Sequence, residues 1–168
     1  MSSSDRHPLQ HRNERAPMQY RRFGRTNLAL SVVTLGGMRY PDGWTEPRDQ
    51  LPAASIDECR ESVLQALDAG INHIETAHGY GKSEHLYGKV LSEIGVPRDR
   101  YFFMTKGAPD TADGTHRLIE EQLRTLRMDH IDLYAWHGIN TQERFAKALA
   151  PGGPVEVLRR YQEQGVIG

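Results

Sequence analysis

From residue 55 onward, the chain alternates between short apolar runs that resemble strands and longer segments with helical periodicity. The expected strands cover residues 71–75, 101–106 and 131–137, and the expected helices cover residues 55–69, 83–94, 113–126 and 154–164. Strand–helix alternation at this repeat length predicts parallel strands with helices packed outside them. Two architectures satisfy the pattern, an open doubly wound sheet and a closed (β/α)8 barrel.

The positions of the ionisable residues favour the barrel. Glu75, Lys106 and His137 each end one of the expected strands. Alternate strand residues share a face, so each of these side chains lies on the same face as apolar residues of its own strand. Barrel enzymes build their active sites at the carboxyl ends of the strands. The glycine-rich phosphate-binding turn of doubly wound dinucleotide folds follows none of the strands.

The expected fold class is therefore α/β, a (β/α)8 barrel of which about the first four strand–helix units and the start of a fifth strand are present. A short β-hairpin precedes them, with strands within residues 19–24 and 28–35. Ser55 and Glu58 form a capping-box pattern that predicts the start of the first helix. Residues 1–17 contain almost nothing to bury and are expected to form a disordered leader. Residues 18–168 are then the N-terminal, truncated part of the barrel.

Composition narrows the function classes. The formal net charge is −1, which gives no attraction toward nucleic acid, and the single cysteine excludes an intrachain disulfide. No apolar run reaches the roughly 20 residues of a membrane span. We expect a cytoplasmic protein that acts on a small molecule, binds neither nucleic acid nor membrane, and holds no metal.

Four reactive side chains point to one chemistry. They are Glu75, Tyr80, Lys106 and His137. Hydride addition to a carbonyl leaves an alkoxide unless a proton arrives in step, and a phenol can supply that proton. A free tyrosine has a pKa of about 10, and a nearby ammonium lowers it. Lys106 would supply the ammonium, Glu75 would pair with it, and His137 would donate a hydrogen bond to the carbonyl oxygen.

The same residues carry a resemblance to a known family. The segments concerned are residues 20–26, 35–39, 70–77, 80–84, 105–106 and 132–138, in this order. Together they resemble the aldo/keto reductases over essentially all of residues 18–168. The resemblance implies a (β/α)8 barrel, NADPH as the hydride donor, and an aspartate–tyrosine–lysine–histidine tetrad for the reduction of aldehydes or ketones.

Matched residue by residue, the resemblance makes Tyr80, Lys106 and His137 members of that tetrad. The family aspartate is replaced by Glu75, whose extra methylene shifts the geometry. Gly37 and Met38 match the loop that lies beside the nicotinamide in the family, so Gly37, Met38 and Glu75 are the expected cofactor-binding residues.

The resemblance also predicts what lies outside the 168 residues. The family takes its adenosine and phosphate contacts mainly from later strands, so weak or no NADPH binding is expected of this chain alone. Three explanations are open: a truncated sequence or gene model, two chains that complement one another, and a relic that has lost the remainder. A half barrel has open sheet edges, which invite pairing.

Two other functions remain open. The glutamate at position 75 and the short length both favour a non-catalytic, barrel-derived binding or regulatory module. A metal-dependent hydrolase that uses Glu75, His78 and His137 is a second alternative.

Overall fold

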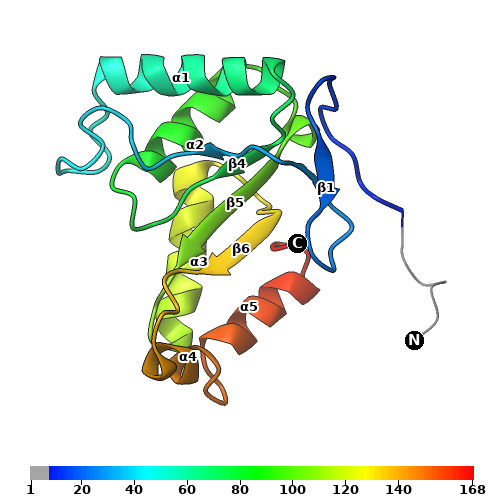
Figure 1. Ribbon diagram of the computed structural model, residues 1–168. Helices are drawn as coiled ribbons and strands as arrows, with labels where there is room; N and C mark the ends of the chain where they lie inside the picture. The colour runs from blue at the N-terminus through cyan, green and yellow to red at the C-terminus, as the bar shows by residue number, and fades with distance from the viewer. Residues whose placement is uncertain (1–7) are drawn as a thin grey trace.

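Four parallel strands form the centre of the computed structural model, which describes residues 8–168 (Figure 1). The sheet has the order β3 (Leu35–Gly36), β4 (His73–Glu75), β5 (Phe102–Gly107) and β6 (Leu133–Trp136). A separate antiparallel hairpin joins β1 (Tyr20–Arg22) to β2 (Ala29–Ser31). Strand order follows chain order, as successive strand–helix units require. Ile167 also pairs with Ile131 in parallel fashion, beside the start of β6.

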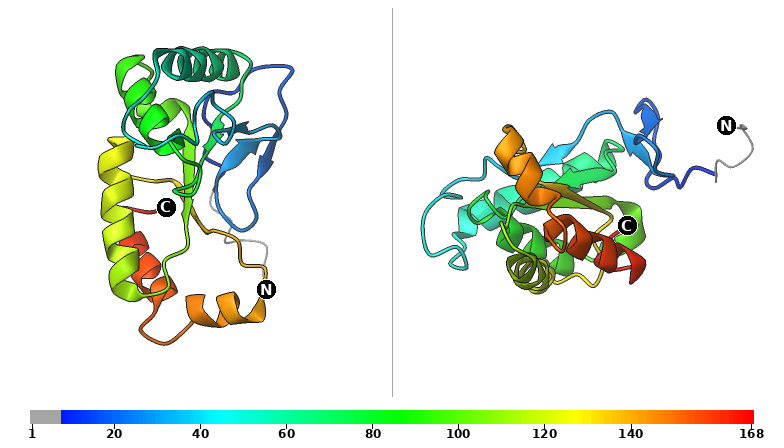
Figure 2. Two further views of the ribbon diagram at one scale, coloured as in Figure 1. Left: turned by 90° about the vertical axis from the view of Figure 1, so that its left-hand side faces the viewer. Right: turned by 90° about the horizontal axis from the view of Figure 1, so that it is seen from below.

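The helices follow the same order as the strands. They are α1 (Ala53–Asp68), α2 (Ser83–Glu93), α3 (Ala112–Leu126), α4 (Gln142–Ala148) and α5 (Pro154–Glu163), with the short 3-10 helix η1 (Arg98–Arg100) before β5. Helix α1 packs on α2, α2 packs on α3, and α3 packs on α5. These helices gather on one side of the sheet, whereas α4 lies beyond the carboxyl ends of the strands (Figure 2).

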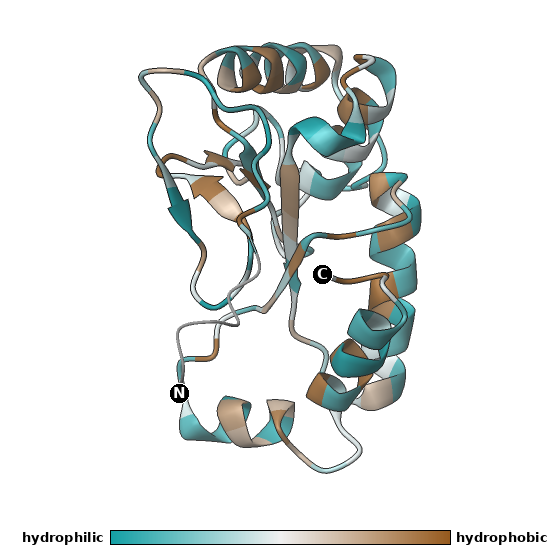
Figure 3. Cartoon of the chain, turned by 90° about the vertical axis from the view of Figure 1, so that its right-hand side faces the viewer, coloured by the Kyte–Doolittle hydropathy of each residue, from teal (hydrophilic) through white to brown (hydrophobic). Residues whose placement is uncertain are grey.

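The core lies between the sheet and the helices. Helix residues Val63 and Val90 and strand residues Ile74 and Phe103 are fully or almost fully buried in it. Because Ile74 and Phe103 face the helices, the alternate residues of β4 and β5 face the opposite side. Strand β5 begins with the apolar residues Phe102, Phe103 and Met104, and Thr105 and Lys106 follow near its carboxyl end. Much of this strand has a hydrophobic colour in Figure 3.

Three local features differ from the sequence expectations. Helix α1 begins at Ala53, and no side chain caps it. The Ser55 hydroxyl instead donates to the carbonyl of Pro41, so the capping-box prediction is wrong. The run over residues 28–35 divides between the hairpin and the parallel sheet. Helix α4 was not expected, because Phe145 and Leu149 are about half exposed and leave no core-facing apolar stripe to detect.

Residues 8–17 also differ from expectation. The sequence predicts disorder over residues 1–17, whereas Asn13 donates to the carbonyl of Leu67 and Arg15 pairs with Asp68. The backbone of Gln10 bonds to Asn27 and Ala29. This segment is fixed by polar contacts, which a search for buried apolar residues cannot detect. Residues 1–7 lie outside the described residues.

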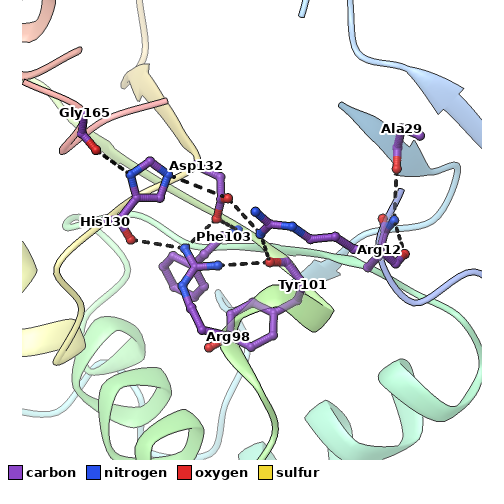
Figure 4. Close-up of polar contacts among 9 residues, drawn as sticks. Arg12, Ala29, Arg98, Tyr101, Phe103, His130, Asp132 and Gly165 are labelled. Atoms are coloured by element: carbon purple, nitrogen blue, oxygen red, sulfur yellow. Dashed lines mark hydrogen bonds and ion pairs between the residues drawn. The ribbon is translucent and has the colours of Figure 1, made fainter. Parts of the chain in front are cut away.

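A buried carboxylate anchors the segment at the amino ends of the strands (Figure 4). Asp132, 4 % exposed, lies 2.8 Å from Arg12 and 2.5 Å from Arg98, and accepts a hydrogen bond from the backbone N–H of Phe103. His130 lies 3.8 Å from the same carboxylate. Both arginines also donate to the carbonyl of Tyr101. One anion thereby joins the N-terminal segment to β5 and β6.

Within residues 8–168, no helix combines the length and the apolar character needed to cross a membrane.

Candidate active site

Three of the four predicted site residues lie where parallel strands end. Glu75 ends β4, Lys106 is the penultimate residue of β5, and His137 directly follows β6. Backbone pairing continues past these ends, because the N–H of His78 donates to the carbonyl of Lys106 and the N–H of His137 donates to the carbonyl of Gly107. The loops after the strands are thereby held against one another.

Tyr80 is placed by a tight loop between β4 and α2. Its N–H donates to the carbonyl of Ala77, and its carbonyl accepts from the N–H of Ser83, the first residue of α2. Gly81 then adopts a φ of +55°, a conformation that glycine tolerates well. Lys82 follows, and its N–H donates to the carbonyl of Gly43 at 2.7 Å. The loop over residues 39–52 therefore binds the backbone two residues after Tyr80 and limits the path of the tyrosine loop.

Glu75 and Lys106 form an ion pair on the face of the sheet that points away from the helices. The Lys106 side chain is only 12 % exposed, and burial lowers its pKa. An ammonium removed from water in this way requires a nearby anion, which Glu75 provides. Glutamate at position 75 therefore reaches the lysine.

The Lys106 ammonium also lies over the Tyr80 ring, 4.7 Å from the ring centroid. The cation therefore faces the π-system of the ring, an arrangement in which an ammonium and an aromatic ring attract one another.

His137 contacts the same tyrosine from a second side. The two rings meet edge to face, with centroids 5.4 Å apart and an interplanar angle of 88°. Burial lowers the pKa of His137, and the positive charges of Lys106 and Arg144 lower it further. A neutral imidazole is therefore favoured, which keeps one N–H donor and one acceptor. Arg144 also donates to the carbonyl of His137 at 3.0 Å.

Gly37 and Met38, the expected nicotinamide neighbours, follow β3. A Cβ at Gly37 would overlap the Ser83 hydroxyl and lie 2.5 Å from the Tyr87 ring. Both residues belong to α2, so the close approach of this helix requires a glycine at position 37. Met38 is 37 % exposed, and a Cβ at Gly36 would meet no atom within 4 Å. This rim thus presents an accessible apolar side chain and open backbone.

Sequence reasoning missed a buried polar network behind Tyr80 and Lys106. Glu84, in the first turn of α2, is 5 % exposed and accepts hydrogen bonds from Thr105 at 2.5 Å and Gln122 at 2.7 Å. Its other oxygen lies 3.5 Å from Nδ1 of His78. The sequence feature that could have indicated this network is Thr105, because it is a polar residue on the helix-facing side of an otherwise apolar part of β5.

A cavity of about 810 Å³ lies away from this cluster, at the amino ends of the strands. Arg12, Asn27, His130 and Gly168 are among its lining residues. Within residues 8–168, no three or more His, Cys, Asp or Glu side chains converge in a way that would hold a metal ion. Glu75, His78 and His137 therefore do not form the ligand group that a metal-dependent hydrolase would need.

Comparison with known proteins identifies the family of this chain. Residues 32–167 match the family model described as "Aldo/keto reductase family". The 6-dehydroglucose reductase of Novosphingobium aromaticivorans is 32 % identical over 136 residues, which cover 72 % of this chain and 42 % of that protein. Methylglyoxal reductase DkgA of Yersinia pestis is 38 % identical over 115 residues, covering 68 % and 39 %. The chain thus spans about two fifths of the length of these curated relatives.

Among solved structures, a Pseudomonas aeruginosa protein assigned as an aldo-keto reductase superposes with a TM-score of 0.73 at 24 % identity. The match covers 99 % of this chain and 62 % of that one. This likeness confirms the expected fold class, with the described strands and helices forming part of a (β/α)8 barrel.

Proposed function

Because this chain belongs to the aldo/keto reductase family, we propose that it carries the acid-catalytic part of an NADPH-dependent oxidoreductase that reduces aldehydes or ketones to alcohols. Membership of the family supports carbonyl reduction in general as part of this proposal. The cofactor, the tyrosine acid and the residue roles are our proposal, and so is a cytoplasmic location. The observation that carries it is the contact of the Tyr80 ring with both Lys106 and His137.

Tyr80 is the proposed general acid. Its hydroxyl gives a proton to the carbonyl oxygen of the substrate while hydride adds to the carbonyl carbon, so that an alcohol and a tyrosinate form. Lys106 stabilises the tyrosinate through its charge over the ring, and Glu75 keeps that ammonium in place. A positioned acid of this kind contributes roughly 10²–10⁴-fold in rate.

His137 is the proposed orienting residue. Its lowered pKa keeps the imidazole neutral near pH 7, and an N–H of the neutral ring donates a hydrogen bond to the carbonyl oxygen. This bond strengthens as negative charge develops on that oxygen. Glu75 is assigned the pairing role because its carboxylate forms an ion pair with Lys106.

NADPH, when bound, supplies the hydride. Gly37, Met38 and Glu75 are the residues of this chain that would hold the nicotinamide end. The exposed side chain of Met38 and the open backbone at Gly36 support that assignment.

The proposal is tested by following the loss of NADPH absorbance with a panel of aldehydes and ketones. The assay is run on this chain and on any longer product of the same gene, and NADPH binding is measured in parallel by fluorescence titration. We expect the longer product to oxidise NADPH in a manner that depends on the carbonyl compound, and this chain alone to bind NADPH weakly or not at all and to show little turnover. A folded protein that binds NADPH and reduces none of the panel would contradict the proposal.

The alternative is a non-catalytic binding or regulatory module. The replacement of the family aspartate by Glu75 is the observation that favours it. A folded protein whose longest form neither binds nor oxidises NADPH would support this alternative.

A further inference from the structure

Glu84 is a buried carboxylate that the proposed chemistry does not use. It projects from the first turn of α2 between β5 and α3. Among residues 8–168, its one ion-pair partner is His78. Burying the Glu84 carboxylate costs free energy, because its two hydrogen-bond donors, Thr105 and Gln122, are neutral. The protonation state of His78 therefore decides how much of that cost an ion pair offsets.

The partners of Glu84 are the residues that hold the catalytic groups. Thr105 directly precedes Lys106 in β5. Gln122 donates to the Lys106 carbonyl at 3.3 Å as well as to Glu84. His78, two residues before Tyr80, donates its backbone N–H to the same Lys106 carbonyl at 2.9 Å. One carboxylate therefore connects the strand that carries the lysine to the loop that carries the tyrosine.

We propose that Glu84 is a positioning residue for the reaction proposed above, and that its ion pair with protonated His78 fixes the Tyr80 loop against the end of β5. The inference rests on the proposed function for its catalytic consequence, but the contact itself exists in this chain and can be measured without turnover.

The charges around His78 give the contact a pH dependence. Glu84 from α2 raises the pKa of His78 by accepting its hydrogen bond, and Glu121 from α3 adds a smaller effect in the same direction. Burial and Arg48, which also donates to the His78 carbonyl at 3.1 Å, act in the opposite direction. The net pKa is raised, so the ion pair is complete below the ordinary histidine value of about 6.5 and is lost as pH rises through the higher folded value.

The test is an NMR titration of the His78 ring in the isotope-labelled chain, with amide hydrogen exchange of His78 and Tyr80 measured at each pH. The variants are Glu84→Gln, His78→Gln and the matched control Glu121→Gln. The control removes a nearby charge whose side chain, among residues 8–168, makes no hydrogen bond with the side chains of Thr105 and Gln122. We expect Glu84→Gln to lower the pKa of His78, whereas Glu121→Gln lowers it less.

The exchange data separate positioning from a merely structural role. In the wild-type chain, protection of the His78 amide, corrected for intrinsic exchange, should fall about tenfold as His78 loses its proton. In His78→Gln that pH dependence should disappear while the fold remains, which keeps the test decisive even if Glu84→Gln does not fold. Protection that is independent of pH in the wild type, or a His78 pKa unchanged in folded Glu84→Gln, would overturn the inference.

Turnover provides the last comparison. In an active form of the protein, Glu84→Gln should lower kcat about tenfold with little change in KM, because it displaces the acid and not the substrate. An unchanged kcat in this variant would remove Glu84 from the reaction. If the wild-type protein reduces no carbonyl compound, the proposed function fails, and the NMR measurements still decide whether the ion pair positions the loop.

Discussion

The ammonium of Lys106 lies 4.7 Å from the centre of the Tyr80 ring and is held there by an ion pair with Glu75. The contact of the proposed acid with its proposed charge partner therefore runs through the face of the ring.

Replacing Tyr80 by phenylalanine should remove the acid while leaving the ring contacts with Lys106 and His137 intact. We expect carbonyl reduction to fall by about 10²–10⁴-fold in kcat, with the melting temperature nearly unchanged. Steady-state NADPH oxidation measures the effect. Tyr161→Phe, at a tyrosine that contacts His116 away from the site, is the control and should retain full activity. Equal turnover in Tyr80→Phe and wild type would exclude Tyr80 as the acid.

Replacing Glu75 by glutamine should leave the largely buried Lys106 ammonium without its anion. Burial already lowers the pKa of Lys106, and loss of the pair should lower it further, so the lysine loses its proton at a less alkaline pH. Activity should then decline at a lower pH than in the wild type. Carbon-13 NMR of labelled lysine follows the titration, with Glu61→Gln on the exposed face of α1 as the control. Identical Lys106 titrations in the two variants would contradict the ion pair.

The buried carboxylate of Asp132 lies at the amino ends of the strands, at the opposite edge of the sheet from the candidate site. Its replacement should therefore lower the free energy of unfolding without a direct effect on the site. Asp132→Asn leaves Arg12 and Arg98 without their charge partner, and breaking a buried pair costs about 3–5 kcal/mol. Urea unfolding at pH 7 measures the loss. Asp57→Asn, which breaks the exposed pair with Arg60, should cost under about 1 kcal/mol. Similar losses in the two variants would show that Asp132 is not the anchor described here.

His73 should make the fold sensitive to acid. Burial lowers its pKa to about 4, from an ordinary value of about 6.5. Between these two pH values, His73 binds a proton in the unfolded chain but not in the folded chain. The free energy of unfolding therefore falls as pH decreases through this range. The loss is on the order of 3 kcal/mol by pH 4.

His73→Gln should therefore lose less stability than the wild type between pH 7 and pH 4, as measured by urea unfolding at each pH. His11→Gln, at a histidine in contact with Glu14 on the surface, is the control. The same acid sensitivity in wild type and His73→Gln would assign the effect to other groups.

Two adjacent glycines should respond differently to a methyl group. Gly37→Ala places a Cβ against Ser83 and the Tyr87 ring, whereas Gly36→Ala places one in open space. Overpacking typically costs about 1–3 kcal/mol, so Gly37→Ala should unfold at a lower urea concentration than Gly36→Ala. A comparable midpoint for the two variants would show that α2 can move away from β3.

Much of this architecture was determined by local sequence pattern. Alternation of apolar residues placed Ile74 and Phe103 toward the helices, and the same two-residue period placed Glu75 and Lys106 on the opposite face. Because parallel strands end at one edge, the strand assignments alone brought Glu75, Lys106 and His137 to the same edge. The helical stripe of α3 and the glycine ends of α1 and α2 were predictable for the same reason.

The remaining features depended on contacts between distant parts of the chain, which only the tertiary structure decided. Arg12 meets Asp132 across 120 residues, and this pair fixes a segment whose composition predicts disorder. Likewise, the inward direction of Glu84 depends on Thr105 and Gln122, which belong to other elements. The position of the lysine over the Tyr80 ring depends on the loop after β4, whose path is set by a backbone bond to Gly43. Local periodicity sets which face a residue occupies, but loop paths and buried polar partners follow from packing among segments that are far apart in the sequence.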